Sequence, residues 1–231
     1  MLEIDGKAGK DEITFKTKHL ENPINIKEPD VTVGDADYIY VKNFIDEMEP
    51  VLYSDNMLKK PTEYRRYIDV ESFVEWYLIN EIAKNNDALF YTSCYMTFER
   101  GGKLKMGPLW DFDLAFGGYV LLARARSNNP EGFHIKDEGY YKRLFLDTEF
   151  VTQVKKRYND YYNNRDLIFQ RIESDYELLV GKIIPENQTW GIAKAIASEI
   201  EIMQQYKSCV ENMKNWIRTR LDWLYYNINA L

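Results

Sequence analysis

The hydrophobic periodicity of this chain changes once from a helical repeat to a β repeat and then back again. Apolar residues recur at helical spacing in two runs between residues 38 and 82, and again from residue 147 onward. Between them, residues 90–106 consist of two extended, β-rich runs separated by the turn sequence Glu99-Arg100-Gly101-Gly102. The pattern predicts an α+β fold that is mainly helical, with a β-hairpin over about residues 90–106 set on at least five helices.

Helix boundaries are marked by acidic residues and by prolines. Asp69 and Asp147 each precede an apolar helical repeat and are expected to cap it. Met1–Asp5 and Ile13–Lys16 are expected to form short strands joined by a turn, and the prolines that follow rule out a helix before about Asp35. Apolar stripes of the later helices are expected to face the core; they lie at residues 150–161, 167–179, 192–203 and 206–228.

Composition limits the class of protein. The chain has 231 residues, of which 45% are apolar and 15% aromatic, so we expect one globular domain over residues 1–231. Its net charge of −7 argues against a partner that is a nucleic acid or an anionic membrane surface. No apolar run approaches the roughly 18 residues of a membrane span. Cys94 and Cys209 are too far apart in sequence to suggest a metal site.

Two carboxylates stand two residues apart, at Asp111 and Asp113, within an apolar and aromatic segment that includes Trp110. Residues i and i+2 of an extended segment project to the same side, so both carboxylates can face one ligand. Two like charges held close together are costly unless a cation joins them, and hard oxygen ligands suit Mg²⁺. The alternative interpretation is an aromatic-rich turn with two solvated carboxylates.

Asp87 lies in the loop that leads from the second predicted helix into the hairpin. Because a hairpin returns the chain to the edge where it started, we expect the Asp87 and Asp111 carboxylates to lie on the order of 10 Å apart or less, in one cleft. The alternative for Asp87 is a capping or turn role, which is common for a single Asp at such a position.

The residues around these carboxylates carry a family resemblance. The segment Gly107-Pro108-Leu109-Trp110-Asp111-Phe112-Asp113-Leu114-Ala115-Phe116-Gly117 resembles the signature of the spore-coat protein H (CotH) kinase family, a divergent protein-kinase-like group. Residues 72–87 resemble the helix that leads to its catalytic Asp. Weaker similarities at residues 2–5, 15–17, 143–147 and 216–220 extend the match over most of the chain.

The resemblance implies a fold, a reaction and a role for each site residue. Residues 1–34 would be the strands and loop between two lobes, and residues 35–231 a helical, protein-kinase-like large lobe with the inserted hairpin. Asp87 would be the catalytic base, Asp111 a metal ligand, Asp113 a second metal ligand, and Trp110 a nucleotide contact. The cofactors would be Mg²⁺ and ATP, and the partner a protein substrate phosphorylated on Ser or Thr at a bacterial spore coat or cell surface.

The chain departs from the protein-kinase pattern in several respects. No His-Arg precedes Asp87, and Thr92 stands where a metal-binding Asn is usual, so that Ser93 or Asp113 would have to substitute. Neither Gly-x-Gly-x-x-Gly nor Gly-x-x-x-x-Gly-Lys occurs, and almost no small lobe precedes residue 2. We therefore expect a fragment that is inactive alone, with its phosphate-binding lysine upstream.

Two other functions remain open on the sequence. A scaffold or pseudokinase would use the same fold to bind a partner without catalysis. A metal-dependent glycosyltransferase would use Asp111-x-Asp113 for a nucleotide sugar, but the first hundred residues lack the alternation of strands and helices it needs. Residues 121–139 are expected to form a long exposed loop in which Arg124 and Arg126 meet solvent; the alternative is that they meet phosphate or an acidic peptide. His134 is assigned no role, and His19 is expected at the surface.

Overall fold

The computed structural model describes residues 1–60, 62–117, 128–190 and 198–231. Arg124, Arg126 and the stripe residues Ile192 and Ile196 therefore lie outside the described residues. The fold is α+β and mainly helical, as the periodicity predicted. None of the helices in the described part of the chain combines the length and the hydropathy needed to cross a membrane.

One small antiparallel sheet combines the N-terminal strands with the hairpin. Its strands are β1 (Leu2–Ile4), β2 (Thr14–Phe15), β3 (Ile24–Ile26), β4 (Cys94–Thr97) and β5 (Lys105–Met106), in the order β2-β3-β1-β4-β5. The central strand β1 pairs with β3 on one side and with β4 on the other, so Leu2 lies opposite both Ile26 and Met96. The sequence analysis did not predict β3, which separates β1 from β2. Its Ile24 and Ile26 are buried, as are both apolar residues of β1.

The predicted hairpin is present, but its first strand is shorter than expected. Residues 90–93 form a turn instead of a strand, and Phe90 and Ser93 adopt positive φ. β4 therefore begins at Cys94, and it pairs with β5 through Met96 and Met106. The hairpin still connects the end of one helix to the segment around Asp111.

Seven α-helices occur in the described residues. They are α1 (Ala36–Tyr53), α2 (Val70–Ala83), α3 (Tyr141–Leu144), α4 (Thr148–Asn163), α5 (Asp166–Leu179), α6 (Ile183–Trp190) and α7 (Glu199–Asn229). Two predicted caps are confirmed, because the Asp69 side chain accepts from the Ser72 backbone N–H and the Asp147 side chain accepts from that of Glu149.

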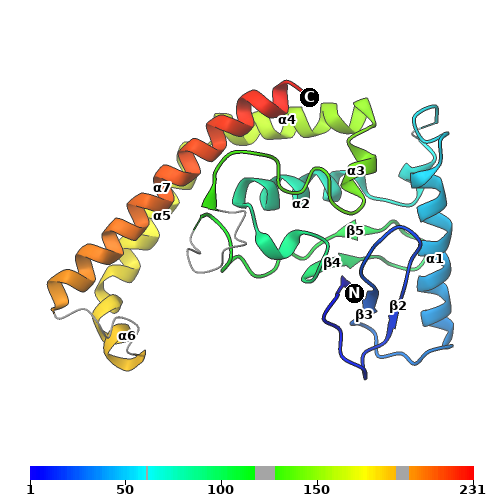
Figure 1. Ribbon diagram of the computed structural model, residues 1–231, viewed down its shortest axis with the longest axis horizontal. Helices are drawn as coiled ribbons and strands as arrows, with labels where there is room; N and C mark the ends of the chain where they lie inside the picture. The colour runs from blue at the N-terminus through cyan, green and yellow to red at the C-terminus, as the bar shows by residue number, and fades with distance from the viewer. Residues whose placement is uncertain (61, 118–127, 191–197) are drawn as a thin grey trace.

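The core lies around α2. This helix packs between the sheet side of the molecule and the pair formed by α4 and the C-terminal half of α7 (Figure 1). Its buried aromatic side chains make ring contacts with the segment at α3; Trp76, for example, stacks on Tyr141 with centroids 5.8 Å apart. Because α2 is buried on several sides, the residues that follow its C-terminus are held by the core.

The stripe of α5 is not core, contrary to the sequence prediction. Leu167 is 60% exposed and Leu178 is 73% exposed, and no residue of α5 is fully buried. Figure 1 shows α5 running beside the N-terminal half of α7, away from the rest of the molecule. A pair of helices buries only the side on which its members meet, as Tyr176 and Tyr206 do, so the outer apolar positions stay exposed.

Candidate active site

Three carboxylates from two loops converge at one place. Asp87 lies in a short 3₁₀ turn (Asn86–Ala88) just after α2, whereas Asp111 and Asp113 follow β5. One carboxylate oxygen from each of the three residues lies within 4.8 Å of the other two. Asp87 is half-buried, and the other two are exposed. The expectation that the hairpin brings Asp87 close to Asp111 is therefore confirmed, while the chemical roles of these residues stay predictions.

Two asparagines bind the two loops to each other. Asn85 is buried; its Oδ1 accepts from the Asp87 backbone N–H at 3.2 Å, and its Nδ2 donates to the Asp111 carbonyl at 3.0 Å. Asn86 donates through Nδ2 to the Leu114 carbonyl at 2.7 Å. The sequence analysis included these residues only in the segment that resembles the helix leading to the catalytic Asp. The two adjacent asparagines directly before Asp87 were the signal that could have revealed this clamp, by which we mean the hydrogen bonds of Asn85 and Asn86 between the two loops.

A buried ion pair holds the residues next to this clamp in place. Arg220 of α7 and Glu81 of α2 are both fully buried, with Nη2 and Oε1 2.6 Å apart. The Glu81 carboxylate also accepts from the backbone N–H groups of His134 and Ile135 at 2.6 and 2.8 Å. His134 then donates from Nε2 to the Asn85 carbonyl at 2.9 Å. The ion pair thus links α7 and α2 to the loop that carries Asp87.

The prediction that residues 121–139 form an exposed loop is wrong for residues 134–135. His134 and Ile135 are buried, because the two oxygens of Glu81 bind their backbone and draw this segment onto the end of α2. His134 therefore has a structural place that the sequence analysis did not assign. His19 is partly exposed, close to the surface position expected, and its ring stacks on Tyr53 with centroids 3.9 Å apart.

Unusual backbone conformations surround the carboxylates. Positive φ is energetically unfavourable for residues with a side chain, and it persists only where the surrounding structure imposes it. Among the described residues other than glycine, it occurs at Lys84, Phe90, Ser93, Asp111 and Phe116. Asp111 itself belongs to the carboxylate cluster, and the other four positions lie within about six residues of Asp87 or Asp113 in sequence. Such strain is frequent at sites where geometry serves a function.

The electrostatic environment distinguishes Asp87 from its neighbours. Burial raises the pKa of Asp87, the nearby ammonium of Lys7 opposes that rise, and the charges of Asp113 and Asp111 add to it. A carboxylate with a raised pKa binds a proton more readily and is better suited to accept one from a substrate. The sequence analysis did not single out Lys7.

Trp110, the predicted nucleotide contact, lies in different surroundings from Thr92 and Ser93, which stand near the position of the usual metal-binding Asn. Trp110 is 55% exposed, and its ring meets that of Tyr95 edge to face, with centroids 5.7 Å apart. Thr92 is buried, and its hydroxyl donates to Asp5. The Ser93 backbone N–H donates to Glu3. These contacts anchor residues 92–93 to β1 and to the residue that follows it.

The carboxylate cluster fits a hard divalent cation. Its donors are all carboxylate oxygens, and two of the three residues are exposed, which leaves room for water and substrate oxygens in the remaining coordination positions. Mg²⁺ typically takes one or two protein carboxylates together with water and phosphate, so two carboxylates such as Asp111 and Asp113 would suffice as its ligands.

Comparisons with known proteins give one finding. A protein-family model described as "CotH kinase protein" matches residues 7–224, which is nearly the whole chain. Neither the curated proteins nor the solved structures give a match. The matched range includes Asp87, Asp111 and Asp113.

Proposed function

The chain belongs to the CotH kinase family, and from this premise we propose that it is a kinase domain that transfers the γ-phosphoryl group of ATP to Ser or Thr side chains of a protein. The observation that carries the proposal is the convergence of Asp87, Asp111 and Asp113, one oxygen of each within 4.8 Å of the others. We further propose that residues 35–231 correspond to the large lobe of a protein kinase, and that residues 1–231 form one domain.

The two loops divide the chemistry between them. A seryl or threonyl hydroxyl oxygen attacks the γ-phosphorus, and Asp87 accepts the hydroxyl proton. The bond from that phosphorus to the β–γ bridging oxygen breaks, and ADP leaves with the electron pair. Burial of Asp87, which raises its pKa, favours its role as proton acceptor.

Asp111 and Asp113 would hold Mg²⁺, which when bound neutralises phosphate charge and orients the nucleotide. The Asn85 clamp fixes the Asp111 loop against the Asp87 loop, so the proton acceptor and the metal ligands keep their spacing. The exposed ring of Trp110 offers a flat apolar surface for the nucleotide base. We propose a coat or surface protein of a bacterial spore or cell as the phosphoacceptor, on the family resemblance alone.

One observation favours a second candidate, a non-catalytic binding protein. The outer sides of α5 and α6 expose large apolar side chains such as Leu178 and Trp190, which are 73% and 71% exposed. Exposed apolar surface of this kind often marks a binding face. A binding protein requires no proton acceptor, so substitution of the three carboxylates would impair a kinase but not a binding protein.

Substitution of the carboxylates in the full-length protein tests the proposal. We expect Asp87→Asn to lower phosphate transfer by about 10²–10⁴-fold while Mg²⁺–ATP affinity stays nearly unchanged, because a base acts on the acceptor hydroxyl. We expect Asp111→Asn to weaken Mg²⁺–ATP binding itself, because it removes a metal ligand.

Transfer of radiolabelled γ-phosphate to casein, as a general acceptor, and calorimetry with Mg²⁺–ATP provide the two measurements. Asp175→Asn is the matched control, since this residue lies on α5 in an exposed pair with Arg171. If wild type binds no nucleotide, or if both site variants transfer phosphate as wild type does, the kinase function fails and the binding protein takes its place.

A further inference from the structure

Lys7 lies beside the segment that follows Asp87. It belongs to the turn between β1 and β2, and its ammonium nitrogen is 5.7 Å from the centroid of the Tyr91 ring. Its backbone N–H donates to Asp5 Oδ1 at 2.8 Å. A residue far from the carboxylates in sequence is thus placed next to their loop.

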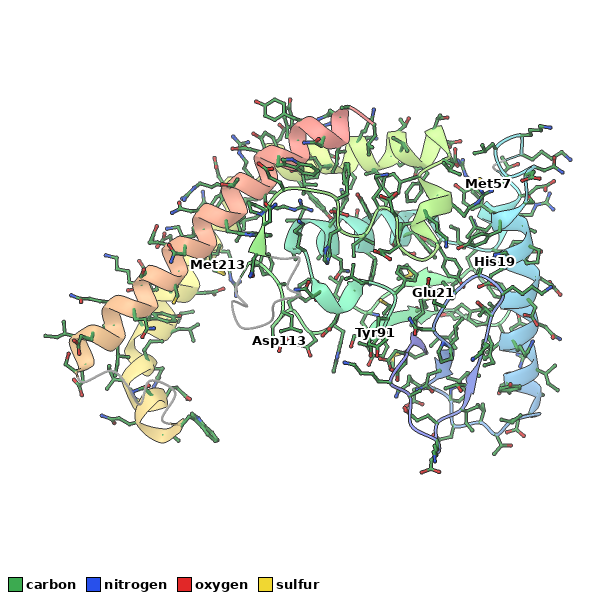
Figure 2. The ribbon with its side chains drawn as sticks, in the orientation of Figure 1. His19, Glu21, Met57, Tyr91, Asp113 and Met213 are labelled. Carbon is green, nitrogen blue, oxygen red and sulfur yellow. The ribbon has the colours of Figure 1, made fainter. Side chains whose placement is uncertain are left out.

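The turn that carries Lys7 is fixed to that loop by its backbone. The Gly6 N–H donates to the Tyr91 carbonyl at 2.6 Å, and Asn22 Nδ2 donates to the Phe90 carbonyl at 2.9 Å. A Cβ at Gly6 would lie 2.6 Å from Asn22 Oδ1 and 2.9 Å from a carbon of the Tyr91 ring, so glycine is what permits this close approach. In Figure 2, Tyr91 and Asp113 both lie below α2, in the central part of the molecule.

Lys7 is a cation at the loop that follows Asp87, because its turn is bonded to residues 90 and 91 and its ammonium lies over the Tyr91 ring. Its charge also opposes the rise that burial causes in the pKa of Asp87. The three carboxylates and a nucleotide triphosphate all carry negative charge, so a cation on the Asp87 side of the cluster lowers the cost of bringing them together. The phosphorus under attack must lie on that side, because Asp87 receives the proton of the attacking hydroxyl.

We propose that Lys7 is a catalytic residue that binds the γ-phosphoryl oxygens of the nucleotide beside Asp87, an assignment that rests on the proposed kinase function. The lysine holds the γ-phosphoryl group while the acceptor oxygen bonds to phosphorus and ADP departs. It neutralises charge on the oxygens that do not react and takes no proton itself. This places a phosphate-binding lysine within the chain, in the turn after its first strand.

Three variants of the full-length protein test the assignment. Lys7→Ala removes the cation, Lys7→Arg retains it, and Lys10→Ala is the matched control, an exposed lysine in the same turn region. We expect Lys7→Ala to weaken Mg²⁺–ATP binding about tenfold and to leave Mg²⁺–ADP binding unchanged, because only ATP carries the γ-phosphate. We expect it to lower phosphate transfer to casein about 10²-fold. Lys7→Arg should retain the preference for ATP, and Lys10→Ala should behave as wild type in both measurements.

The outcomes separate the two proposals. If wild type transfers phosphate and Lys7→Ala matches it, or if Lys7→Ala weakens ADP and ATP equally, the assignment of Lys7 is overturned while the kinase function stands. If wild type neither binds Mg²⁺–ATP nor transfers phosphate, the kinase function fails and the assignment of Lys7 fails with it. Selective loss of ATP affinity together with loss of transfer supports both.

Discussion

Replacement of Arg220 by methionine should destabilise the protein more than any change at its surface. The Arg220 side chain is fully buried, and besides Glu81 Oε1 it binds three backbone carbonyls. Nε and Nη2 donate to the Glu81 carbonyl at 3.2 and 2.8 Å, and Nη1 donates to the Pro130 and Gly132 carbonyls at 2.7 and 2.8 Å. Methionine fills much of the same volume but donates to none of these acceptors.

The size of the effect follows from what remains buried in the variant. Glu81 would be left inside the core without its counter-charge, and removal of one partner of a buried ion pair typically costs about 3–5 kcal/mol. The carbonyl groups that lose their donors are part of this cost, because such losses are not additive. Since typical domains have a free energy of unfolding of about 5–15 kcal/mol, Arg220→Met should remove a large fraction of the stability. Arg220→Lys keeps the charge but not the fork of donors, so we expect it to lose roughly half as much.

Urea unfolding at neutral pH, followed by circular dichroism, gives the free energy of unfolding for each variant. Arg171→Met is the matched control, because Arg171 pairs with Asp175 on the exposed surface of α5, with side-chain exposures of 78% and 43%. Exposed pairs of this kind contribute about 0.3–0.5 kcal/mol. If Arg220→Met costs no more than Arg171→Met, the buried ion pair does not anchor α7 to α2 as described.

Two further predictions concern packing and pH. Gly117 has φ +70°, and a Cβ there would lie 2.5 Å from the Trp216 ring, whereas a Cβ at Gly101, which also has positive φ, would meet nothing within 4 Å. We therefore expect Gly117→Ala to lower the free energy of unfolding in urea by about 1–3 kcal/mol more than Gly101→Ala does. Equal losses would contradict the Trp216 contact. Burial alone would raise the pKa of Asp147, but hydrogen bonds, first among them that from Tyr64, lower it below 3.8. The stability that this ionised carboxylate contributes is therefore complete above pH 3.8 and is lost as pH falls through the folded-state pKa. We expect the difference in free energy of unfolding between wild type and Asp147→Asn to shrink in acid. A difference that stays constant with pH would refute this.

Local signals in the sequence were sufficient for several parts of the fold. The caps at Asp69 and Asp147 were predicted because a capping side chain bonds to backbone only two or three residues away. The hairpin was predicted because strand period and turn chemistry are also local, although its first strand begins four residues later than expected. The meeting of Asp87 and Asp111 followed from the hairpin that joins them.

Contacts between segments far apart in sequence were not predictable in the same way. β3 could have been a loop, and only its pairing with β1 makes it a strand. The stripe of α5 is amphipathic like that of α4, yet α4 buries Phe150, Val154 and Tyr158, whereas no residue of α5 is buried. Periodicity shows which side of a helix is apolar, but not whether anything covers that side.

For this protein, the sequence by itself determined the α+β class, the main caps, the hairpin and the family motif around Asp111, because each depends on residues that are near neighbours in the chain. Tertiary structure alone decided that Lys7 lies over Tyr91 in the loop after Asp87, that Arg220 pairs with Glu81, and that His134 supports the loop of Asp87. These groups are brought together by long-range packing, and the energy of a charge depends on burial and on neighbours that no local pattern specifies.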